Sequence, residues 1–321
     1  MRIISTFQTI KNAVIKILAI ADSVIFIYQA AFGYWEAHLT RGLYILFALV
    51  LTFLVNPKRK GETGSVVQVL DVMLALTSTI VIVYYIQRFD IFAENAGLPL
   101  DPLDLAMGII TLLLVLEACR RAVGSALTII AAIFLLYCYF GSYLPGPLYH
   151  RGYSVNRIMS VMYASTDGIF GSVVYVFSTF IFLFLIFGVF LKNSGASQFF
   201  IELAKALVGR FTGGAAQAAV ISSWILGSIM GSSTANTAVT GSVTIPLMIS
   251  RGYKPHVAAA VEAVVSIGGQ FMPPIMGAAA FLMAAFLGIP YFEVVKAGLL
   301  PALLFFFSMI FMVYLEAKRM G

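Results

Sequence analysis

A run of polar, uncharged residues lies at 227–244, where the chain reads GSIMGSSTANTAVTGSVT between two apolar stretches. Half of these residues carry a side-chain hydroxyl or amide: Ser228, Ser232, Ser233, Thr234, Asn236, Thr237, Thr240, Ser242 and Thr244. A lipid-facing helix gains nothing from these oxygens, and a tight helix–helix contact needs only a few small residues. Irregular polar segments at membrane depth are tolerated where they are buried in protein or line a cavity. The run therefore predicts a site for an ion or a solute inside a membrane protein.

A second segment of the same kind lies at 266–277, which reads SIGGQFMPPIMG with apolar sequence on both sides. Its paired glycines weaken a helix, and its paired prolines remove two amide donors and clash with the preceding turn. Secondary transporters place coupling-ion and substrate sites at such breaks, where unwound carbonyls are free to coordinate a cation. A double proline alone also fits a simple kink, and a run of small residues alone also fits tight packing. Both segments within about 50 residues favour a shared site.

Glu262 is the most unusual ionisable residue, because it lies in the apolar run VAAAVEAVVSIGG, six residues before Gly268. A carboxyl group inside a membrane is a functional candidate. Glu262 also lies close to the expected start of its span near His256, which fits a position near the membrane surface equally well. The histidines lie in expected loops without metal-ligand spacing, and no nucleophile–base arrangement or nucleotide-binding motif occurs. The sequence therefore predicts a protein that is not an enzyme and holds no organic cofactor.

The composition fixes the class of protein in which these segments lie. Hydrophobic residues make up 61% of the chain and charged residues 11%, with a mean hydropathy of +0.97. This predicts an all-α polytopic membrane protein with about eight spanning helices, each needing about 20 apolar residues. The expected spans are 13–34, 40–55, 66–87, 103–119, 122–140, 170–191, 256–287 and 297–316.

Three segments of the second half are expected to depart from simple spans. Residues 214–250 have two half-length apolar arms around a polar tip, which predicts a re-entrant helical hairpin. Residues 256–287 predict a broken helix. Residues 196–210 are amphipathic and predict a helix that lies on the bilayer surface in contact with membrane lipid.

The lysines and arginines predict the orientation. With the N-terminus in the cytoplasm, five of the 20 lie outside, namely Arg41, Arg88, Arg151, Arg157 and Lys296, and the remaining ones lie inside. This bias agrees with the positive-inside rule, provided that the hairpin enters and leaves on the same side. Both termini are then cytoplasmic. The net charge of +6 is spread over short loops, which argues against a nucleic-acid partner.

The paired motifs resemble a known family. The segment GSIMGSSTANTAVTGSVTIPLM, followed by GYKPHVAAAVEAVVSIGGQFMPPIMGAAAFLMA, is similar to the large membrane subunit of tripartite ATP-independent periplasmic (TRAP) transporters. It most resembles the fused permeases that work with TAXI-type binding proteins. Residues 150–321 resemble the first half of the large subunit, and residues 1–142 resemble a small-subunit scaffold fused in front of it.

The resemblance implies sodium-coupled uptake of an organic anion of the carboxylate type through a bacterial or archaeal inner membrane. It also implies an elevator-like movement and delivery of the substrate by a periplasmic binding protein. The ion and substrate site carried over by motif comprises Ser232, Ser233, Thr234, Asn236 and Thr237 in the hairpin, and Gly268, Gly269, Gln270, Pro273 and Pro274 in the broken helix.

The sequence departs from the family pattern in one respect. The family site lies between two inverted repeats, each with a hairpin and a broken helix, and this sequence shows one of each. We therefore expect transport only with a second repeat, supplied by further sequence or by a separate chain, because the charge bias disfavours an antiparallel homodimer. Two alternatives remain open: a cation-coupled anion carrier that needs no binding protein, and a membrane scaffold subunit that does not transport.

Overall fold

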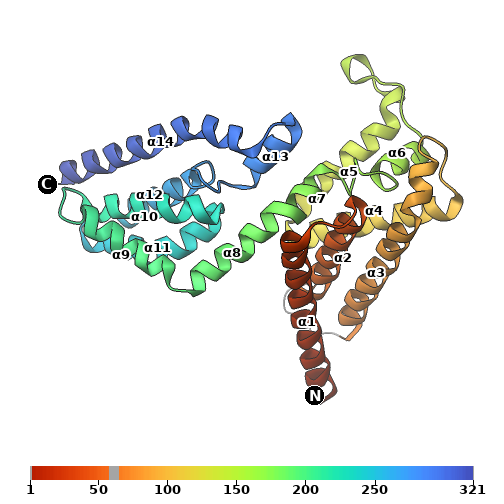
Figure 1. Cartoon of the computed structure of the whole chain (residues 1–321), viewed down its shortest axis with the longest axis horizontal. Helices are drawn as coiled ribbons and strands as arrows, with labels where there is room; N and C mark the ends of the chain where they lie inside the picture. Colours follow the sequence, from red (N-terminus) through yellow and green to blue (C-terminus); the bar gives the residue numbers. More distant parts are fainter. Residues whose placement is uncertain (1, 58–64, 321) are drawn as a thin grey trace. The chain divides into compact units, whose positions relative to one another are not determined.

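The computed structural model describes residues 2–57 and 65–320, which form helices joined by turns and short loops (Figure 1). The helices gather into two compact units, Met1–Ser178 and Thr179–Gly321. The predicted boundary between residues 142 and 150 rests on resemblance to two family subunits, whereas this division rests on contacts within the structure. The predicted boundary stays a prediction.

The first unit contains five long helices and two short ones. These are α1 (Arg2–Phe32), α2 (Ala37–Val55), α3 (Ser65–Glu94), α4 (Pro102–Ala122), α5 (Ser125–Phe140), α6 (Val155–Met162) and α7 (Ser172–Val176). Two 3₁₀ turns, Gly141–Tyr143 and Gly146–Leu148, lie between α5 and α6. Aromatic rings fill its core, where Tyr85 of α3 stacks on Phe170 with ring centroids 3.7 Å apart.

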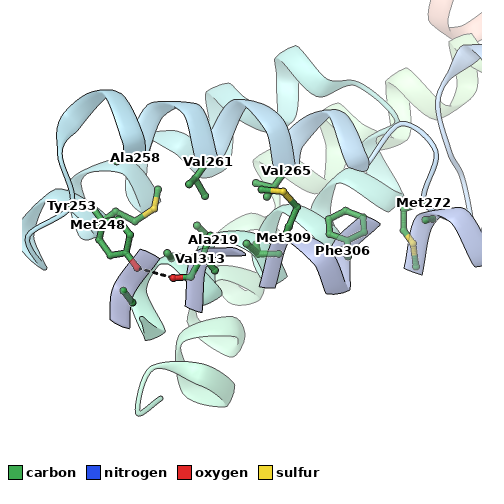
Figure 2. Packing of buried hydrophobic residues seen from close by; sticks show 14 residues of the cluster. Ala219, Met248, Tyr253, Ala258, Val261, Val265, Met272, Phe306, Met309 and Val313 are labelled. Atoms are coloured by element: carbon green, nitrogen blue, oxygen red, sulfur yellow. Dashed lines mark hydrogen bonds between the residues drawn. The ribbon is translucent and has the colours of Figure 1, made fainter. Parts of the chain in front are cut away.

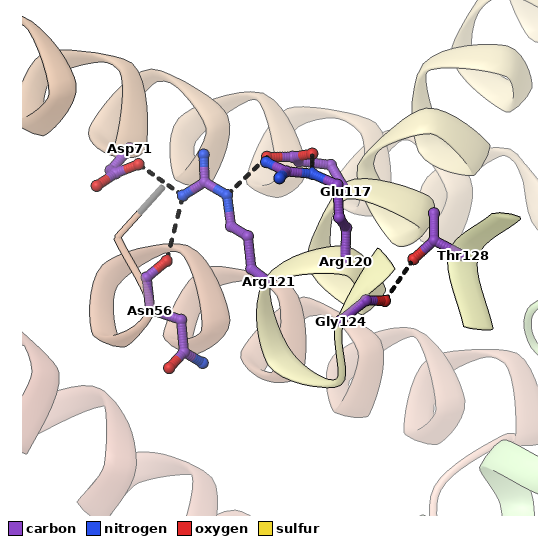
Figure 3. A network of polar contacts seen from close by, with 7 residues as sticks. All are labelled: Asn56, Asp71, Glu117, Arg120, Arg121, Gly124 and Thr128. Atoms are coloured by element: carbon purple, nitrogen blue, oxygen red, sulfur yellow. Dashed lines mark hydrogen bonds and ion pairs between the residues drawn. The ribbon is translucent and has the colours of Figure 1, made fainter. Parts of the chain in front are cut away.

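Ion pairs connect the helices of the first unit. Arg121 of α4 bonds to Asp71 of α3 at 2.6 Å and to Glu117 at 2.8 Å, and it also donates to the carbonyl of Asn56 (Figure 3). The side chains of Arg121 and Asp71 are 3% and 1% exposed. Arg120 forms a second pair with Glu117. This network ties α2, α3 and α4 together through fixed charges.

The second unit carries both polar segments. A π-helical turn (Phe177–Ile181) leads into α8 (Phe182–Asn193), followed by α9 (Ala196–Val208), α10 (Gly214–Met230), α11 (Ser233–Ser250), α12 (Pro255–Gly268), α13 (Ala278–Leu287) and α14 (Tyr291–Met320). Its core lies where α10, α12 and α14 pack together (Figure 2). Small residues such as Ala219 and Ala258 permit close helix contacts beside Phe306 and Val313.

Tyr253 closes one end of this core. Its hydroxyl donates to the carbonyl of Val313 at 3.4 Å (Figure 2). Burial raises the pKa of Tyr253, and the nearby Glu316 raises it further. The turn between α11 and α12 is thereby attached to α14.

The prediction of an all-α polytopic membrane protein is confirmed. Within the described residues, six helices are long and apolar enough to cross a membrane: Ala37–Val55, Val67–Glu94, Pro102–Ala122, Ser125–Tyr143, Ser172–Leu191 and Tyr291–Met320. The expected span 13–34 lies in α1, and the expected span 256–287 consists of two shorter helices, α12 and α13, with an unwound segment between them.

Helix α9 covers the expected surface helix 196–210. It packs against α10 through Ser197, Ile201 and Ala204, while Phe199 and Leu207 are exposed. Phe199 and Leu207 are therefore turned away from the described core of the unit, whereas Ile201 and Ala204 face it. Its placement on the bilayer surface stays a prediction.

Candidate functional site

The hairpin tip is built from a glycine and a serine. Helix α10 ends at Met230 because Gly231 takes the left-handed conformation, with φ 61°, that an L side chain rarely adopts. The Oγ of Ser232 then caps α11 by accepting from the amide of Ala235 at 3.4 Å. The chain reverses within these two residues, so α10 and α11 form a helical hairpin.

The break in the second segment runs from Gly269 to Gly277. Helix α12 ends at Gly268, and α13 begins at Ala278. The unwound chain includes a cis peptide bond between Pro273 and Pro274. The amide of Gly277 donates to the carbonyl of Gln270 at 2.5 Å and closes the segment into a compact loop.

The hairpin and the break are in contact. The side-chain amide of Gln270 donates to the Oγ of Ser233 at 3.1 Å, and the amide of Ile275 donates to the carbonyl of Ser228 at 3.1 Å. Gly227 lies against Gly269 so closely that a Cβ on Gly227 would come within 2.7 Å of the Gly269 Cα. The two polar segments therefore lie in direct contact, and a shared site between them stays a prediction.

Asn236 lies at the centre of this contact and is fully buried. Its Nδ2 donates to the carbonyl of Ser223 at 3.1 Å, and a Cβ on Gly227 would come within 2.9 Å of that Nδ2. Its Oδ1 has no hydrogen-bond partner within the described structure. Buried polar atoms are almost always satisfied, so an orphaned oxygen calls for an explanation such as an unseen water or ion.

A second polar cluster surrounds Glu262, which is also fully buried. Hydroxyl groups from α10, α11 and α12 contact its carboxyl oxygens: Ser223 at 2.8 Å, Thr244 at 2.5 Å, Ser266 at 3.2 Å, and Thr240. Ser223 connects the two clusters, because its carbonyl accepts from Asn236 while its hydroxyl contacts Glu262. The hairpin thus holds a continuous polar interior.

The remaining residues of the predicted site lie around this centre. Ser232 caps α11, and Gly268 ends α12. Thr237 and Pro273 are half-buried, and Thr234, Gln270 and Pro274 are exposed. Their roles stay predictions. The structure adds Ser223, Thr240, Thr244 and Ser266 around Glu262, of which Ser223 lies outside both polar segments. The four-residue spacing of Glu262 and Ser266 in the sequence could have indicated that both side chains lie on the same face of a helix.

No metal centre of the usual kind is visible. Within residues 2–57 and 65–320, no group of three or more histidine, cysteine, aspartate or glutamate side chains is arranged to hold a metal ion. The site offers hydroxyl, amide and carbonyl oxygens and the carboxyl group of Glu262, without the nitrogen and sulfur ligands that transition metals favour.

Comparison with known proteins identifies the family. Residues 110–321 match the family described as "Tripartite ATP-independent periplasmic transporter, DctM component", over more than half of the chain. The chain belongs to this family. The resemblance drawn from the hairpin and the broken helix is confirmed, and the protein is a multi-pass membrane protein of a TRAP permease family.

The relatives are permease proteins. The chain is 30% identical over 138 residues to the "Isethionate TRAP transporter permease protein DctMQ" of Oleidesulfovibrio alaskensis, a match that covers 43% of the chain and 21% of the relative. It is 29% identical over 135 residues to the "C4-dicarboxylate TRAP transporter large permease protein DctM" of Pseudomonas aeruginosa, covering 42% and 31%. The chain thus spans a third or less of the length of these relatives. No solved structure matches the chain.

Proposed function

We propose that this TRAP-family chain is a permease component for sodium-coupled uptake of an organic anion of the carboxylate type. Its family is a transporter family, and the names of two relatives, for isethionate and C4-dicarboxylates, both denote organic anions. In this proposal a periplasmic binding protein of the TAXI type delivers the substrate. The protein lies in a bacterial or archaeal inner membrane with both termini in the cytoplasm.

The proposal assigns transport to the assembled permease. Residues 1–142 serve as a scaffold of the small-subunit type, and 150–321 carry the first hairpin and broken helix of the transport part. A second repeat, in further sequence or in a separate chain, completes the transport path, whereas the cation site at the first hairpin is formed by this chain.

The observation that supports a cation site is the orphaned Oδ1 of Asn236. The side chain of Asn236 lies beside Gly227, which in turn lies against Gly269 where the hairpin meets the break. A sodium ion needs several neutral oxygens held close together, and an amide oxygen is a suitable ligand. Binding at Asn236 would satisfy this oxygen and attach the hairpin tip to the broken helix.

The test is the effect of sodium on thermal unfolding of the purified chain, compared with potassium at equal ionic strength. A ligand that binds only the folded state stabilises it by mass action, by about 2.7 kcal/mol at 100 times its Kd. We expect Asn236→Ala to abolish the sodium effect and Ser233→Ala to weaken it. Asn193→Ala, on an exposed residue of α8, is the matched control and should keep the full effect.

Three results would contradict the proposal. Full sodium stabilisation in Asn236→Ala would place the cation elsewhere, and no sodium effect in the unmodified chain would favour a scaffold subunit. Uptake into proteoliposomes by the assembled permease without a binding protein would favour an independent carrier.

A further inference from the structure

Glu262 is a buried carboxyl group that the proposed cation site does not use. It is 0% exposed, and hydroxyl groups of Ser223, Thr240, Thr244 and Ser266 contact it. An ionised carboxylate without a partner is costly in such surroundings, and buried acidic groups commonly bind a proton instead. The surroundings of Glu262 therefore decide its charge.

The elements around Glu262 bring no countercharge to it. Helices α10 and α11 contain no acidic, basic, histidine or tyrosine side chain. Helix α12 adds His256, six residues away and so about 9 Å along the axis. The titratable residues of α14, which packs against α12, lie near its two ends: Tyr291, Glu293, Lys296, Tyr314, Glu316, Lys318 and Arg319. The described contacts of Glu262 include hydroxyl groups only.

These hydroxyl groups can serve both charge states. Thr240 contacts the carbonyl of Asn236 at 2.8 Å as well as Glu262, and Thr244 contacts the carbonyl of Thr240 at 2.9 Å as well as Glu262. Each hydroxyl has one proton to donate and lone pairs to accept with. When the threonines donate to Glu262, they solvate a carboxylate. When they donate to the helix carbonyls, their oxygens can accept the proton of a neutral Glu262.

We propose that Glu262 of α12 is an exchangeable proton-binding site packed against the hairpin of α10 and α11. We further propose that release of its proton strengthens cation binding at Asn236. Rotation of the threonine O–H bonds adapts the ring to either charge state, and the proton itself is exchanged with water. The proton site rests on the geometry around Glu262. The effect on cation binding rests on the proposed function.

The coupling has a direct physical route. Ser223 contacts Asn236 through its carbonyl and Glu262 through its hydroxyl, and Thr240 contacts the carbonyl of Asn236 and the same carboxyl oxygen. Glu262 and Asn236 both contact Ser223 and Thr240, so a negative charge on Glu262 would attract a cation bound at Asn236, whereas a neutral carboxyl group would not. Because coupling between two ligands is reciprocal, bound sodium should lower the proton affinity by the same factor.

The proton site is tested by infrared difference spectroscopy of the full chain over a range of pH. We expect a carbonyl band of a protonated carboxyl group that disappears as the pH rises. The part of this band that belongs to Glu262 should be missing from Glu262→Gln and retained in Glu202→Gln, the matched control on an exposed glutamate of α9. If Glu262→Gln does not fold, Thr244→Val replaces it. Removing this donor to the carboxylate should raise the midpoint of the band by about one pH unit, tenfold in proton affinity.

The coupling is tested by the sodium dependence of thermal unfolding at acidic and alkaline pH. We expect the unmodified chain to bind sodium roughly tenfold more weakly when Glu262 is protonated, and Glu262→Gln to bind weakly at both pH values. A band that is unchanged in Glu262→Gln, or a midpoint unmoved in Thr244→Val, overturns the proton site. No sodium effect at any pH overturns the proposed function and the coupling but leaves the proton site. A sodium effect independent of pH overturns the coupling alone.

Discussion

The two units bury their acidic residues in different ways. In the first unit Asp71 and Glu117 both contact Arg121, and Asp104 contacts Arg88 at 3.3 Å. In the second unit the described contacts of Glu262 are hydroxyl groups. The ion pairs described in that unit, such as Lys296 with Glu293, lie near the ends of α14. Asp22 in α1 departs from the pattern, since it is buried and takes part in none of the described ion pairs.

This difference separates a fixed charge from a variable one. An arginine remains protonated in proteins, so an acidic residue that it contacts is held ionised. A hydroxyl group can donate to a carboxylate or accept from a carboxylic acid. The acidic residues of the first unit that contact arginine are therefore suited to a constant negative charge. The surroundings of Glu262 in the second unit are suited to a charge that changes. Three substitutions test this contrast.

The largest effect is expected for Arg121→Met in the first unit. This substitution leaves Asp71 and Glu117 without the guanidinium group that they share, and Asp71 is 1% exposed. Breaking a buried ion pair from one side costs about 3–5 kcal/mol, because the remaining charge stays buried. Chemical unfolding of the purified chain measures the loss. A cost below about 1 kcal/mol is the range found for ion pairs on protein surfaces. It would contradict the interpretation that this buried network stabilises the first unit.

A smaller effect is expected for Gly227→Ala in the hairpin. The new Cβ would come within 2.7 Å of the Gly269 Cα, which is backbone and cannot rotate away. Overpacking of this kind costs about 1–3 kcal/mol, and we expect a value near the upper end together with loss of the sodium effect. Gly42→Ala in the first unit is the comparison, since its Cβ would meet the flexible side chain of Ile86 at 2.8 Å.

Gly188→Ala in α8 is the control for the glycine substitutions, because its Cβ would meet no atom within 4 Å. Unfolding temperatures with and without sodium distinguish the three variants. If Gly227→Ala behaves like Gly188→Ala, the hairpin and the broken helix do not depend on this contact.

The sequence predicts features that local chemistry determines. The hairpin could be placed because two apolar arms flank a polar tip, and the structure puts the reversal at Gly231 and Ser232. The break could be placed because its paired glycines and prolines disfavour a helix wherever they occur. Membrane spans follow from the length of apolar runs, although the structure ends several of them at other residues.

Features that depend on packing could not be predicted in the same way. The hydrogen bond from Gln270 to Ser233 joins residues 37 positions apart, and the contact of Ser223 with Glu262 joins residues 39 positions apart. Both depend on the rotation of α10, α11 and α12 about their axes. Glu262 could be marked as unusual from its apolar neighbours, but its hydroxyl ring required the fold.

The smallest effect is expected for Ser266→Ala, which removes the most distant hydroxyl of the Glu262 ring, at 3.2 Å. Hydrogen bonds to charged groups contribute about 1.5–3 kcal/mol and those between neutral groups about 0.5–1.5 kcal/mol. If Glu262 is the proposed proton site, Ser266→Ala should therefore cost about 2 kcal/mol at alkaline pH, where the proposal has Glu262 ionised, and about 1 kcal/mol at acidic pH, where the proposal has it protonated. The cost is larger at alkaline pH because the Ser266 hydroxyl donates to the carboxylate and so stabilises the form of Glu262 without the proton.

Unfolding of Ser266→Ala across a pH series measures this difference. Ser242→Ala is the matched control, because the Ser242 hydroxyl is exposed and donates to the carbonyl of Val239 in its own helix. Its cost should be small and independent of pH. A cost for Ser266→Ala that is equal at both pH values would show that Glu262 keeps one charge state throughout. The charge of Glu262 in the second unit would then be as constant as the charges of the acidic residues in the first unit. The two units would differ only in whether an arginine or hydroxyl groups contact the carboxyl group.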